Sequence, residues 1–486
     1  MKNIALLACL LLSAQRPLWG KLHTENSLLQ KAKTTPNPTN LQIATMYSAA
    51  ELEAAATHAN FAPALFSNLA YNKTNEKPLS QMSPVFSPTS GGTLGITKPF
   101  QHGLTASLST TANQKTSLPI NIRGHTHTNA EVKVTMDLWK NLLGKLDKTK
   151  ILLANSGLEK AKAMTIIQKK AFQVEIRKIY WSLIANRESQ KYAKSLLRSA
   201  RKQMLEAGKR LEASIGSQTE VARLKAQVTT RQNVIASLNF DKVNLQKALI
   251  RLIPALAESP IELAPVNIVK TIQQVKQCAN VIKSRVQDPL SDTAYKPLLL
   301  AIEKSQRAQK VITSAANQMD LKLTSSYQLV ANGDNAEYSS TFSDMPTTPY
   351  NGYAFALQLR VPIGEATDHL QRRKLAVEKS RFESEKLDLM AQLASQQAAI
   401  IPHVGLMFEA LRNQKQNTNL LQQSVNSVAS RYKQARLSLL ELIREQDALQ
   451  DSQLQEINTN LRIIVTLLDH LKVFTELPCT LNKPIS

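Results

Sequence analysis

The chain is poor in the residues that compact enzymes use. Aromatic residues make up 5% of its 486 residues, and it has 14 glycines and three cysteines. Beyond the N-terminal region no stretch has 18 or more uninterrupted apolar residues, which excludes a transmembrane helix there. No Ser-His-Asp, Cys-His or glycine-rich phosphate-loop arrangement can be assembled. We therefore expect neither an enzyme nor a bound cofactor.

Basic residues are in excess. The formal net charge is +23, which favours anionic partners such as nucleic acid, lipid or lipopolysaccharide headgroups, or acidic cargo. The lysines and arginines are spread along helical stretches and are not massed in one tail. This distribution favours the simpler interpretation, a solvated charged surface.

The N-terminus resembles a secretory signal, which we assign to residues 1–20. Lys2 precedes an apolar run from Ile4 to Leu12, which is too short to span a bilayer as a helix. Cleavage after Ala14 and cleavage after Gly20 both fit. The signal predicts export from the cytoplasm.

Two minor features could carry chemistry. Export permits a disulfide between Cys278 and Cys479, although sequence cannot show the required geometry. His125 and His127 would share one side of a strand, but no cysteine or carboxylate cluster accompanies them. We therefore expect a surface loop there and no metal site.

The same order of elements occurs twice, about 220 residues apart: an alternating strand, a glycine, a long helical stretch and a short motif. Gly144 to Glu220 is 76 residues, and Gly364 to Glu441 is 77. A repeat that keeps its spacing over such a length indicates architecture. Each copy is one strand-plus-helical-hairpin unit.

Strict alternation of apolar and polar residues predicts strands with one apolar and one wet face. In a membrane barrel the apolar face meets lipid and the polar face lines a lumen; the alternative is a soluble hairpin packed on a helix. Polar loops are expected at 72–92 and 110–129. The strand-like segments are Phe61–Tyr71, Leu94–Ile96, Leu104–Leu108, Glu131–Trp139, Leu321–Leu329 and Ala354–Val361.

Helical periodicity dominates the remainder. No proline lies between Lys145 and Ile253, and apolar residues there step by three and four, as in coiled coils. Pro402 and Gly405 are expected to kink or break the corresponding helix of the second copy. The apolar series of the first return helix is Val221, Leu224, Val228, Ile235, Leu238 and Leu245.

These patterns predict a mainly α chain with some β structure. After the signal, the expected parts are a loose leader and a short helix (21–60, with the helix from Asn40 to Asn60), strands and loops (61–139), a helical hairpin (140–253), short wrapping helices (254–320), strands (321–363), a second hairpin (364–476) and a tail (477–486).

Two tip motifs and the strand-to-helix junctions carry a family resemblance. The tip motifs are Arg210-Leu-Glu-Ala-Ser-Ile-Gly-Ser-Gln-Thr-Glu220-Val and Arg431-Tyr-Lys-Gln-Ala-Arg-Leu-Ser-Leu-Leu-Glu441-Leu, and one junction is Leu359-Arg-Val-Pro-Ile-Gly364. With these motifs in register, the chain resembles the TolC-type outer-membrane efflux family over nearly its whole mature length.

The resemblance implies a homotrimer in the outer membrane with a periplasmic extension. Each protomer would lend about four strands to a shared 12-stranded transmembrane β-barrel and its antiparallel coiled-coil hairpins to a periplasmic α-barrel. The implied function is a passive channel of a tripartite efflux or type I secretion system. Its partners would be outer-membrane lipid, a periplasmic adaptor and an inner-membrane pump, with no nucleic acid. The alternative is a soluble, basic periplasmic coiled-coil scaffold that binds anionic partners.

The tip motifs depart from the family at their turns. The turn glycine is replaced by Ser214 in the first copy and by Ala435 in the second, although Gly216 is close by. We therefore expect a different backbone geometry at the tips.

Four residues are candidate constriction or partner contacts at the periplasmic tip. Glu220 and Tyr432 match the family's tip contacts. Glu441 fills the first of two acidic positions, but Arg444 fills the second, so a three-fold pore would carry alternating acidic and basic rings. Alternatively, Glu220 and Glu441 are ordinary acids at helix N-termini, where the helix dipole favours them.

Overall fold

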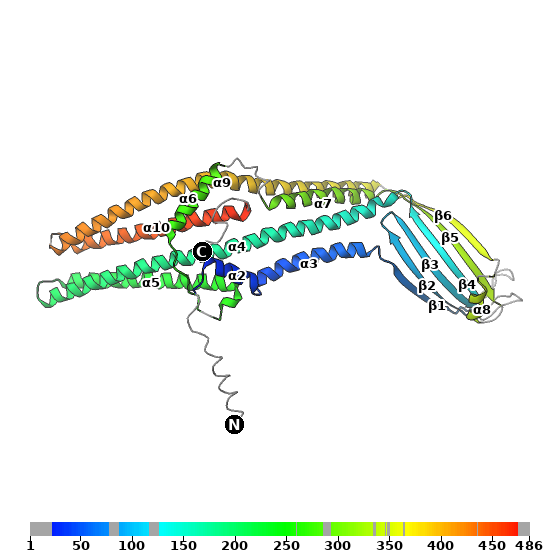
Figure 1. The fold of residues 1–486 in the computed structure, drawn as a ribbon, viewed down its shortest axis with the longest axis horizontal. Coiled ribbons are helices and arrows are strands. Elements are labelled where there is room, and N and C mark those ends of the chain that lie inside the picture. The colour runs from blue at the N-terminus through cyan, green and yellow to red at the C-terminus, as the bar shows by residue number, and fades with distance from the viewer. Residues whose placement is uncertain are drawn as a thin grey trace, which may run out of the picture. The chain divides into compact units, whose positions relative to one another are not determined.

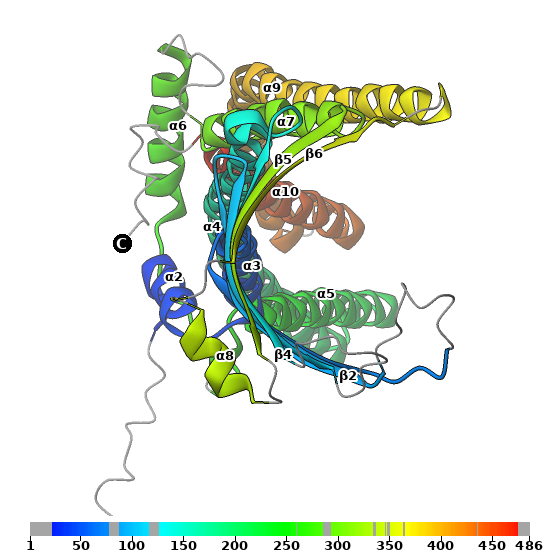
Figure 2. The same cartoon turned by 90° about the vertical axis from the view of Figure 1, so that its right-hand side faces the viewer.

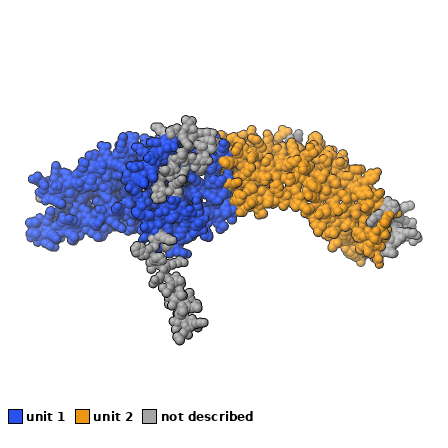
Figure 3. All heavy atoms as spheres, in the orientation of Figure 1, with its two compact units in different colours: residues 1–46, 163–296, 388–486 blue, residues 47–162, 297–387 orange. Residues whose placement is uncertain are grey.

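The computed structural model describes residues 22–76, 87–115, 126–258, 260–284, 293–333, 337–345, 347, 350–362, 365–434 and 436–474. The chain divides into two compact units, which Figure 3 colours separately. Unit 1 comprises Met1–Met46, Ala163–Lys296 and Asp388–Ser486, and unit 2 comprises Tyr47–Lys162 and Pro297–Leu387.

Unit 2 contains one antiparallel sheet whose six strands follow the chain order, and Figure 2 shows that this sheet is curved. The first four strands belong to the first copy of the repeat and the last two to the second. The strands are β1 (Ala64–Asn72), β2 (Thr89–Phe100), β3 (Leu104–Lys115), β4 (Thr126–Asp137), β5 (Asp320–Gly333) and β6 (Asn351–Arg360).

The register aligns apolar residues in a row across all six strands. Their side chains are 44–80% exposed. The opposite face carries polar residues such as Lys133, Glu131 and Gln328. The sheet therefore has one apolar face open to its surroundings and one polar face. The apolar row consists of Leu65, Ile96, Leu108, Val132, Tyr327 and Tyr353.

The sheet corrects two expectations. The resemblance implied about four strands per protomer, whereas the described residues form a sheet of six, one for each strand-like segment. The expected loops at 72–92 and 110–129 are also too long, because β2 begins at Thr89 and β3 continues to Lys115. Glycine-rich and threonine-rich segments look like loops, but strand pairing uses backbone groups and does not depend on apolar side chains.

Gly91 illustrates why glycine occurs inside a strand here. A Cβ at Gly91 would lie 2.8 Å from the backbone carbonyl oxygen of Ala112 on β3. The glycine therefore marks a close approach between β2 and its neighbour, which sequence alone reads as a turn. A short helix, α8 (Tyr338–Asp344), was likewise not expected among the strands.

The junction glycine of the first repeat is required by its backbone. Gly144 has a φ of +75°, and a Cβ there would lie 1.8 Å from the carbonyl oxygen of Gln101. It closes the short 3₁₀ turn η1 (Leu142–Gly144), after which α4 begins at Lys145. The equivalent Gly364 lies outside the described residues.

Figure 1 labels the helices. In the described part of the chain, no helix is both long and apolar enough to cross a membrane. Helices α3, α4, α7 and α9 contribute residues to both units. The bounds are α2 (Glu25–Thr34), α3 (Pro38–Ala59), α4 (Lys145–Glu212), α5 (Gln218–Leu252), η2 (Pro254–Leu256), α6 (Ile268–Ser284), α7 (Tyr295–Ala315), α9 (Glu365–Lys433) and α10 (Leu439–Val473).

In unit 2, ion pairs join the described parts of α4, α7 and α9. Their side chains are largely exposed, so each pair contributes little, about 0–1 kcal/mol. The pairs show which faces of the helices meet. They are Lys304–Glu159 at 2.8 Å, Lys160–Glu385 at 2.7 Å and Lys386–Glu303 at 2.8 Å.

The expected loose leader is wrong, because α2 is a capped helix docked on α4 in unit 1. Thr24 and Ser27 form a capping box. Glu25 is 1% exposed and accepts hydrogen bonds from Nε of Arg177 at 2.6 Å and from Nε1 of Trp181 at 3.2 Å. The segment is too short and polar to indicate a helix, and the tertiary partners of Glu25 stabilise it.

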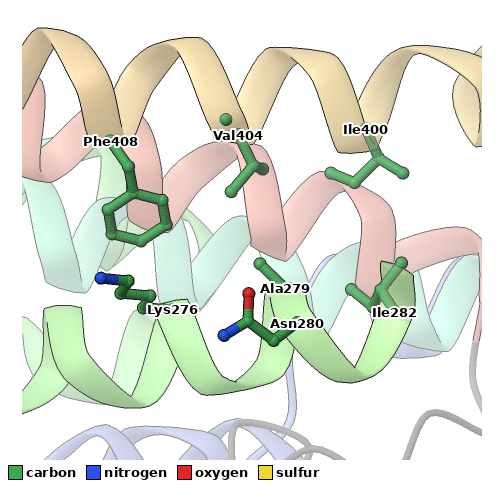
Figure 4. A pocket seen from close by; sticks show the side chains of 8 residues that line it. Lys276, Ala279, Asn280, Ile282, Ile400, Val404 and Phe408 are labelled. Atoms are coloured by element: carbon green, nitrogen blue, oxygen red, sulfur yellow. The ribbon is translucent and has the colours of Figure 1, made fainter. Parts of the chain in front are cut away.

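Of the kink or break expected at Pro402, the break is wrong, because α9 continues through Pro402 and Gly405; the kink stays a prediction. Proline costs about 3 kcal/mol in a helix interior. On either side of it, Ile400 and Val404 are buried in unit 1 and point toward α6, and this burial offsets the cost (Figure 4). A cavity of about 230 Å³ lies between α6 and α9 there.

Cys278, on α6, is 3% exposed and disulfide-bonded. Cys479 lies outside the described residues. The pairing of these two cysteines therefore stays a prediction.

His470, near the end of α10, is a buried titratable group in the core of unit 1. Its ring stacks on Phe474 with centroids 4.4 Å apart. Neither ring nitrogen has a hydrogen-bond partner among the described residues. Burial lowers the pKa of His470 from 6.5 to about 4. The ring is therefore neutral in the folded chain at neutral pH.

This burial predicts acid sensitivity of unit 1. Between pH 6.5 and 4 the unfolded chain protonates this imidazole while the folded chain does not. The stability present above pH 6.5 is therefore lost as the pH falls, by about 3 kcal/mol at pH 4. In His470→Phe, the free energy of unfolding lost between pH 6.5 and 4 should be smaller by about 3 kcal/mol. Urea unfolding at the two pH values, followed by tryptophan fluorescence, measures this difference. The exposed His403, changed to Phe, is the control; equal acid sensitivity of both variants and the unchanged chain contradicts the assignment.

Candidate functional site

The first helix tip is a left-handed turn built without glycine. Helix α4 ends at Glu212, and Ser214 has a φ of 61°. The amide of Ile215 donates to the carbonyl of Arg210, and the amide of Ser214 donates to that of Leu211, both at 2.9 Å. These two bonds define a Schellman motif with Ser214 in the position that glycine usually occupies. The serine therefore adopts a left-handed backbone at the cost of strain, and the expected difference from the family's turn geometry stays a prediction.

Gly216 is needed for a different reason. A Cβ there would lie 2.7 Å from the backbone nitrogen of Leu211. The chain then enters α5 through Ser217, whose hydroxyl accepts from the amide of Thr219 at 3.2 Å. The glycine at the tip therefore allows the turn to pack against the last turn of α4.

The second tip closes in a similar way. The amide of Arg436 donates to the carbonyl of Arg431 at 2.9 Å, the same spacing as in the first tip. Ala435 lies outside the described residues. Ser438 then caps α10 in a capping box with Glu441: the Ser438 amide and hydroxyl donate to Oε2 of Glu441 at 3.1 and 3.0 Å.

The structure brings Glu220 and Tyr432 together. The Tyr432 hydroxyl, at the end of α9, donates a hydrogen bond to Oε1 of Glu220 in the first turn of α5. On the other side, the guanidinium of Arg210 lies 5.7 Å from the centre of the Tyr432 ring. One phenol thus links the end of α4, the start of α5 and the end of α9. We call Arg210, Glu220 and Tyr432 the tip triad.

A small apolar cluster lies next to the triad. Ala207, Leu224 and Leu439 are buried, and Tyr432 packs against them with neighbouring partly buried side chains. Partial burial raises the pKa of Tyr432 to about 12, and the hydrogen bond to Glu220 acts in the same direction. The phenol therefore remains a neutral donor across the physiological pH range.

Glu441 and Arg444 lie apart from the tip triad. Both are exposed in the first turns of α10, and neither contacts Glu220 or Tyr432 in the described part of the chain. The carboxylate of Glu441 is engaged in its own helix cap, which fits the alternative of an ordinary N-terminal acid. Their role at a constriction stays a prediction.

Sequence reasoning missed a polar layer between α5 and α10. Arg231 is 4% exposed and pairs with Asp447. One turn nearer the tip, Nε2 of Gln227 donates to Oε1 of Gln446 at 3.3 Å. The signal was present, because Arg231 falls between Val228 and Ile235 in the heptad series, where an apolar residue is expected.

The described residues also bear on the possibility of a metal site. No group of three or more His, Cys, Asp or Glu side chains in the described ranges could hold a metal ion. His127 lies on β4, and its Nδ1 is 2.7 Å from Oδ1 of Asn332 on β5, while His125 lies outside those ranges.

No family model and no curated protein matches this sequence. Solved structures do match. VceC, an outer membrane protein of Vibrio cholerae, has 14% sequence identity, with 93% of this chain and 97% of its own covered and a TM-score of 0.69. The CmeC outer membrane channel of Campylobacter jejuni has 10% identity over 92% of this chain and 84% of its own, with a TM-score of 0.63.

The open state of the MtrE outer membrane channel of Neisseria gonorrhoeae is also similar, at 14% identity, 92% and 88% coverage and a TM-score of 0.60. The chain therefore has the fold of outer-membrane channels. This confirms, at the level of the fold, the resemblance to the TolC-type family that the tip motifs indicated.

The strain at Ser214 gives a first prediction for the tip. Ser214→Gly should relieve a left-handed backbone and stabilise the tip by about 0.5–1 kcal/mol. Slower hydrogen exchange of the amides of residues 213–216 would register this. Ser217→Ala is the matched control at the same tip: it removes an N-cap and should destabilise by about 1 kcal/mol. Faster exchange in Ser214→Gly is incompatible with the strained turn.

The tip triad gives a second prediction. A charge-assisted hydrogen bond is worth about 1.5–3 kcal/mol, and partial exposure reduces this value. We expect a coupling of about 1 kcal/mol between Tyr432→Phe and Glu220→Gln in a double-mutant cycle, read from exchange of the first amides of α5. Glu441→Gln with Tyr432→Phe is the control pair and should show no coupling. Additive effects of the first pair mean that the bond contributes nothing.

Proposed function

We propose that this chain is the protomer of a trimeric outer-membrane channel that passes solutes from the periplasm to the exterior. The observation that carries the proposal is the sheet of unit 2. Its apolar row is exposed on every strand, and its opposite face is polar. Such a sheet fits a lipid boundary on one side and an aqueous lumen on the other.

The unpaired sheet edges support assembly from several copies. Among the described strands, β1 pairs only with β2 and β6 only with β5. Lipid offers no hydrogen bonds to open edges, so a membrane sheet must close on itself. A cyclic trimer would join β6 of one copy to β1 of the next without another component.

The strand count changes the size of the proposed pore. The resemblance implied a barrel of 12 strands from about four per protomer. Six strands per protomer give eighteen strands in a trimer. Because barrel diameter grows roughly linearly with strand number, the exit pore would be about one and a half times as wide as a 12-stranded one.

The helical hairpins fit a periplasmic conduit with a constriction at the tips. Each hairpin ends in one of the tip turns, and α10 presents Glu441 and Arg444 exposed beside its turn. We infer that three copies bring these side chains into rings at the narrow end. The chain would be passive and would depend on a periplasmic adaptor and an inner-membrane pump, in an efflux or type I secretion system.

The rival function is a basic coiled-coil scaffold bound peripherally to anionic partners. The net charge of +23 favours it, and the exposed apolar row argues against it. Extraction separates the two, because carbonate or high salt releases a peripheral scaffold from membranes but leaves an integral channel in place. Release of the full chain by carbonate overturns the channel proposal.

Charge changes at the proposed rings should alter conduction. Arg444→Asp replaces three cations with three anions in a trimer, and we expect cation preference to rise at least about twofold at low salt. Glu441→Gln keeps an acceptor for the helix cap and should shift selectivity the other way. Reversal potentials in planar bilayers measure both. Arg412→Asp, exposed on α9 away from the tip, is the control, and unchanged selectivity in both tip variants excludes a constriction made of these residues.

A further inference from the structure

One face of α4 is covered in the middle of the helix and bare toward the tip. Arg177 and Trp181 of this face bind Glu25 of α2. Nearer the tip, Nη1 of Arg187 donates to the carbonyls of Leu263 at 2.9 Å and Ala264 at 3.0 Å. Past Arg187 no described element covers this face.

The bare part of the face is basic. Steps of three and four residues from Arg187 stay on one side of a helix and reach a series of exposed cations. None of them forms an ion pair with a residue that the structure describes. These six residues, which we call the basic face, are Lys191, Lys194, Arg198, Arg201, Lys202 and Lys209.

The opposite side of the same stretch packs inside the protomer. Ala193, Ala200 and Ala207 recur every seven residues, and all three are buried. Asn186 donates to the carbonyl of Leu238 on α5, so α5 flanks this helix. The basic face therefore points away from the layer that α4 forms with its neighbours, on the side that α2 occupies.

An apolar side chain lies within the basic face. Leu205 is 62% exposed and follows Arg201 at the helical spacing of four. Cations surround this leucine at helical spacings, with Glu206 beside it, and the arrangement resembles an interface with an apolar anchor and a charged rim. Like charges three or four residues apart destabilise a helix, so the arrangement favours a partner of opposite charge.

We propose that the basic face docks an acidic helix of a partner protein. The α2 contact supplies the precedent, because there a helix already covers this face and pairs its glutamate with Arg177 at 2.6 Å. The proposal rests on the proposed function in one respect. If the side of α4 that α2 occupies faced the lumen, α2 would narrow the conduit, so this side is the outer, accessible one. The basic face spans about 27 Å at 1.5 Å per residue, the length of a helix of about 18 residues.

The test uses the full-length chain and a defined probe. The probe is a fluorescent helical peptide of about 20 residues with glutamates every three or four positions and one leucine at the centre. The docking variant is the triple change Lys194→Glu, Arg198→Glu and Arg201→Glu. We expect it to weaken binding at least about tenfold at low salt, measured by fluorescence anisotropy. A control peptide has the same composition in scrambled order.

A matched variant controls for net charge. Arg373→Glu, Lys374→Glu and Arg381→Glu make the same charge change on exposed positions of α9. This variant should bind the probe as the unchanged chain does. Equal weakening in both triple variants, or equal binding of the scrambled peptide, overturns the proposal in favour of non-specific attraction.

A second readout identifies the occupant in cells. A photo-crosslinking amino acid at Leu205 should capture a protein through an acidic helical segment, and the docking variant should abolish the capture. Crosslinks only to a second copy of this chain assign the face to self-association and overturn the proposal. The proposal is also overturned if polyphosphate displaces the probe fully and unlabelled peptide does not.

The outcome can be separated from that of the channel proposal. Bilayer conductance of the docking variant should equal that of the unchanged chain, because the basic face lies outside the conduit. A conducting chain that fails to bind the probe overturns docking alone. A chain that binds the probe and inserts into no bilayer overturns the channel alone.

Discussion

Unsatisfied backbone groups at the two sheet edges are the constraint on which the rest of the structure depends. Strands β1 and β6 each have one described neighbour, so each leaves a row of amides and carbonyls without a strand partner among the described residues. In water such edges cause aggregation, and in lipid they cannot persist. The apolar row makes water an unfavourable surrounding for this sheet. Closure with sister copies removes both problems at once, and the proposed trimer is one such closed assembly.

A second constraint concerns the register between the helical hairpins. Long two-helix hairpins with apolar seams could slide along one another, since every heptad offers a similar contact. The buried Gln227–Gln446 pair and the pairing of the buried Arg231 with the half-exposed Asp447 favour one register. At the tips the phenol of Tyr432 makes a further specific link. The distal hairpins of this protomer are therefore held by a few polar contacts on a narrow apolar seam, so a few substitutions could change their alignment.

Particular elements show how far sequence reasoning reaches. Strand-like patterns located the six described strands, and the long proline-free stretch predicted α4 and α5 to within a few residues at their ends, because these patterns follow from local geometry. The family resemblance was right about the fold and wrong about the number of strands. The expectations of a loose leader and of a break at Pro402 were wrong for the same reason. Glu25 and the residues around Pro402 are stabilised by neighbours distant in sequence, and local propensity contains no information about such neighbours. At the tip, the motifs identified Glu220 and Tyr432 but gave no sign that the two side chains bond to each other.

The sequence by itself determined the periodicities, and with them the faces of each strand and helix and the two-fold repeat of strand and hairpin. These properties depend on residues a few positions apart, and a single chain read in order contains them. Only the tertiary structure decided which faces meet: that α2 covers the middle of α4, that Arg231 is buried, and that the basic face is left bare. Such outcomes depend on contacts between segments tens or hundreds of residues apart, whose free energies arise only when the whole core forms.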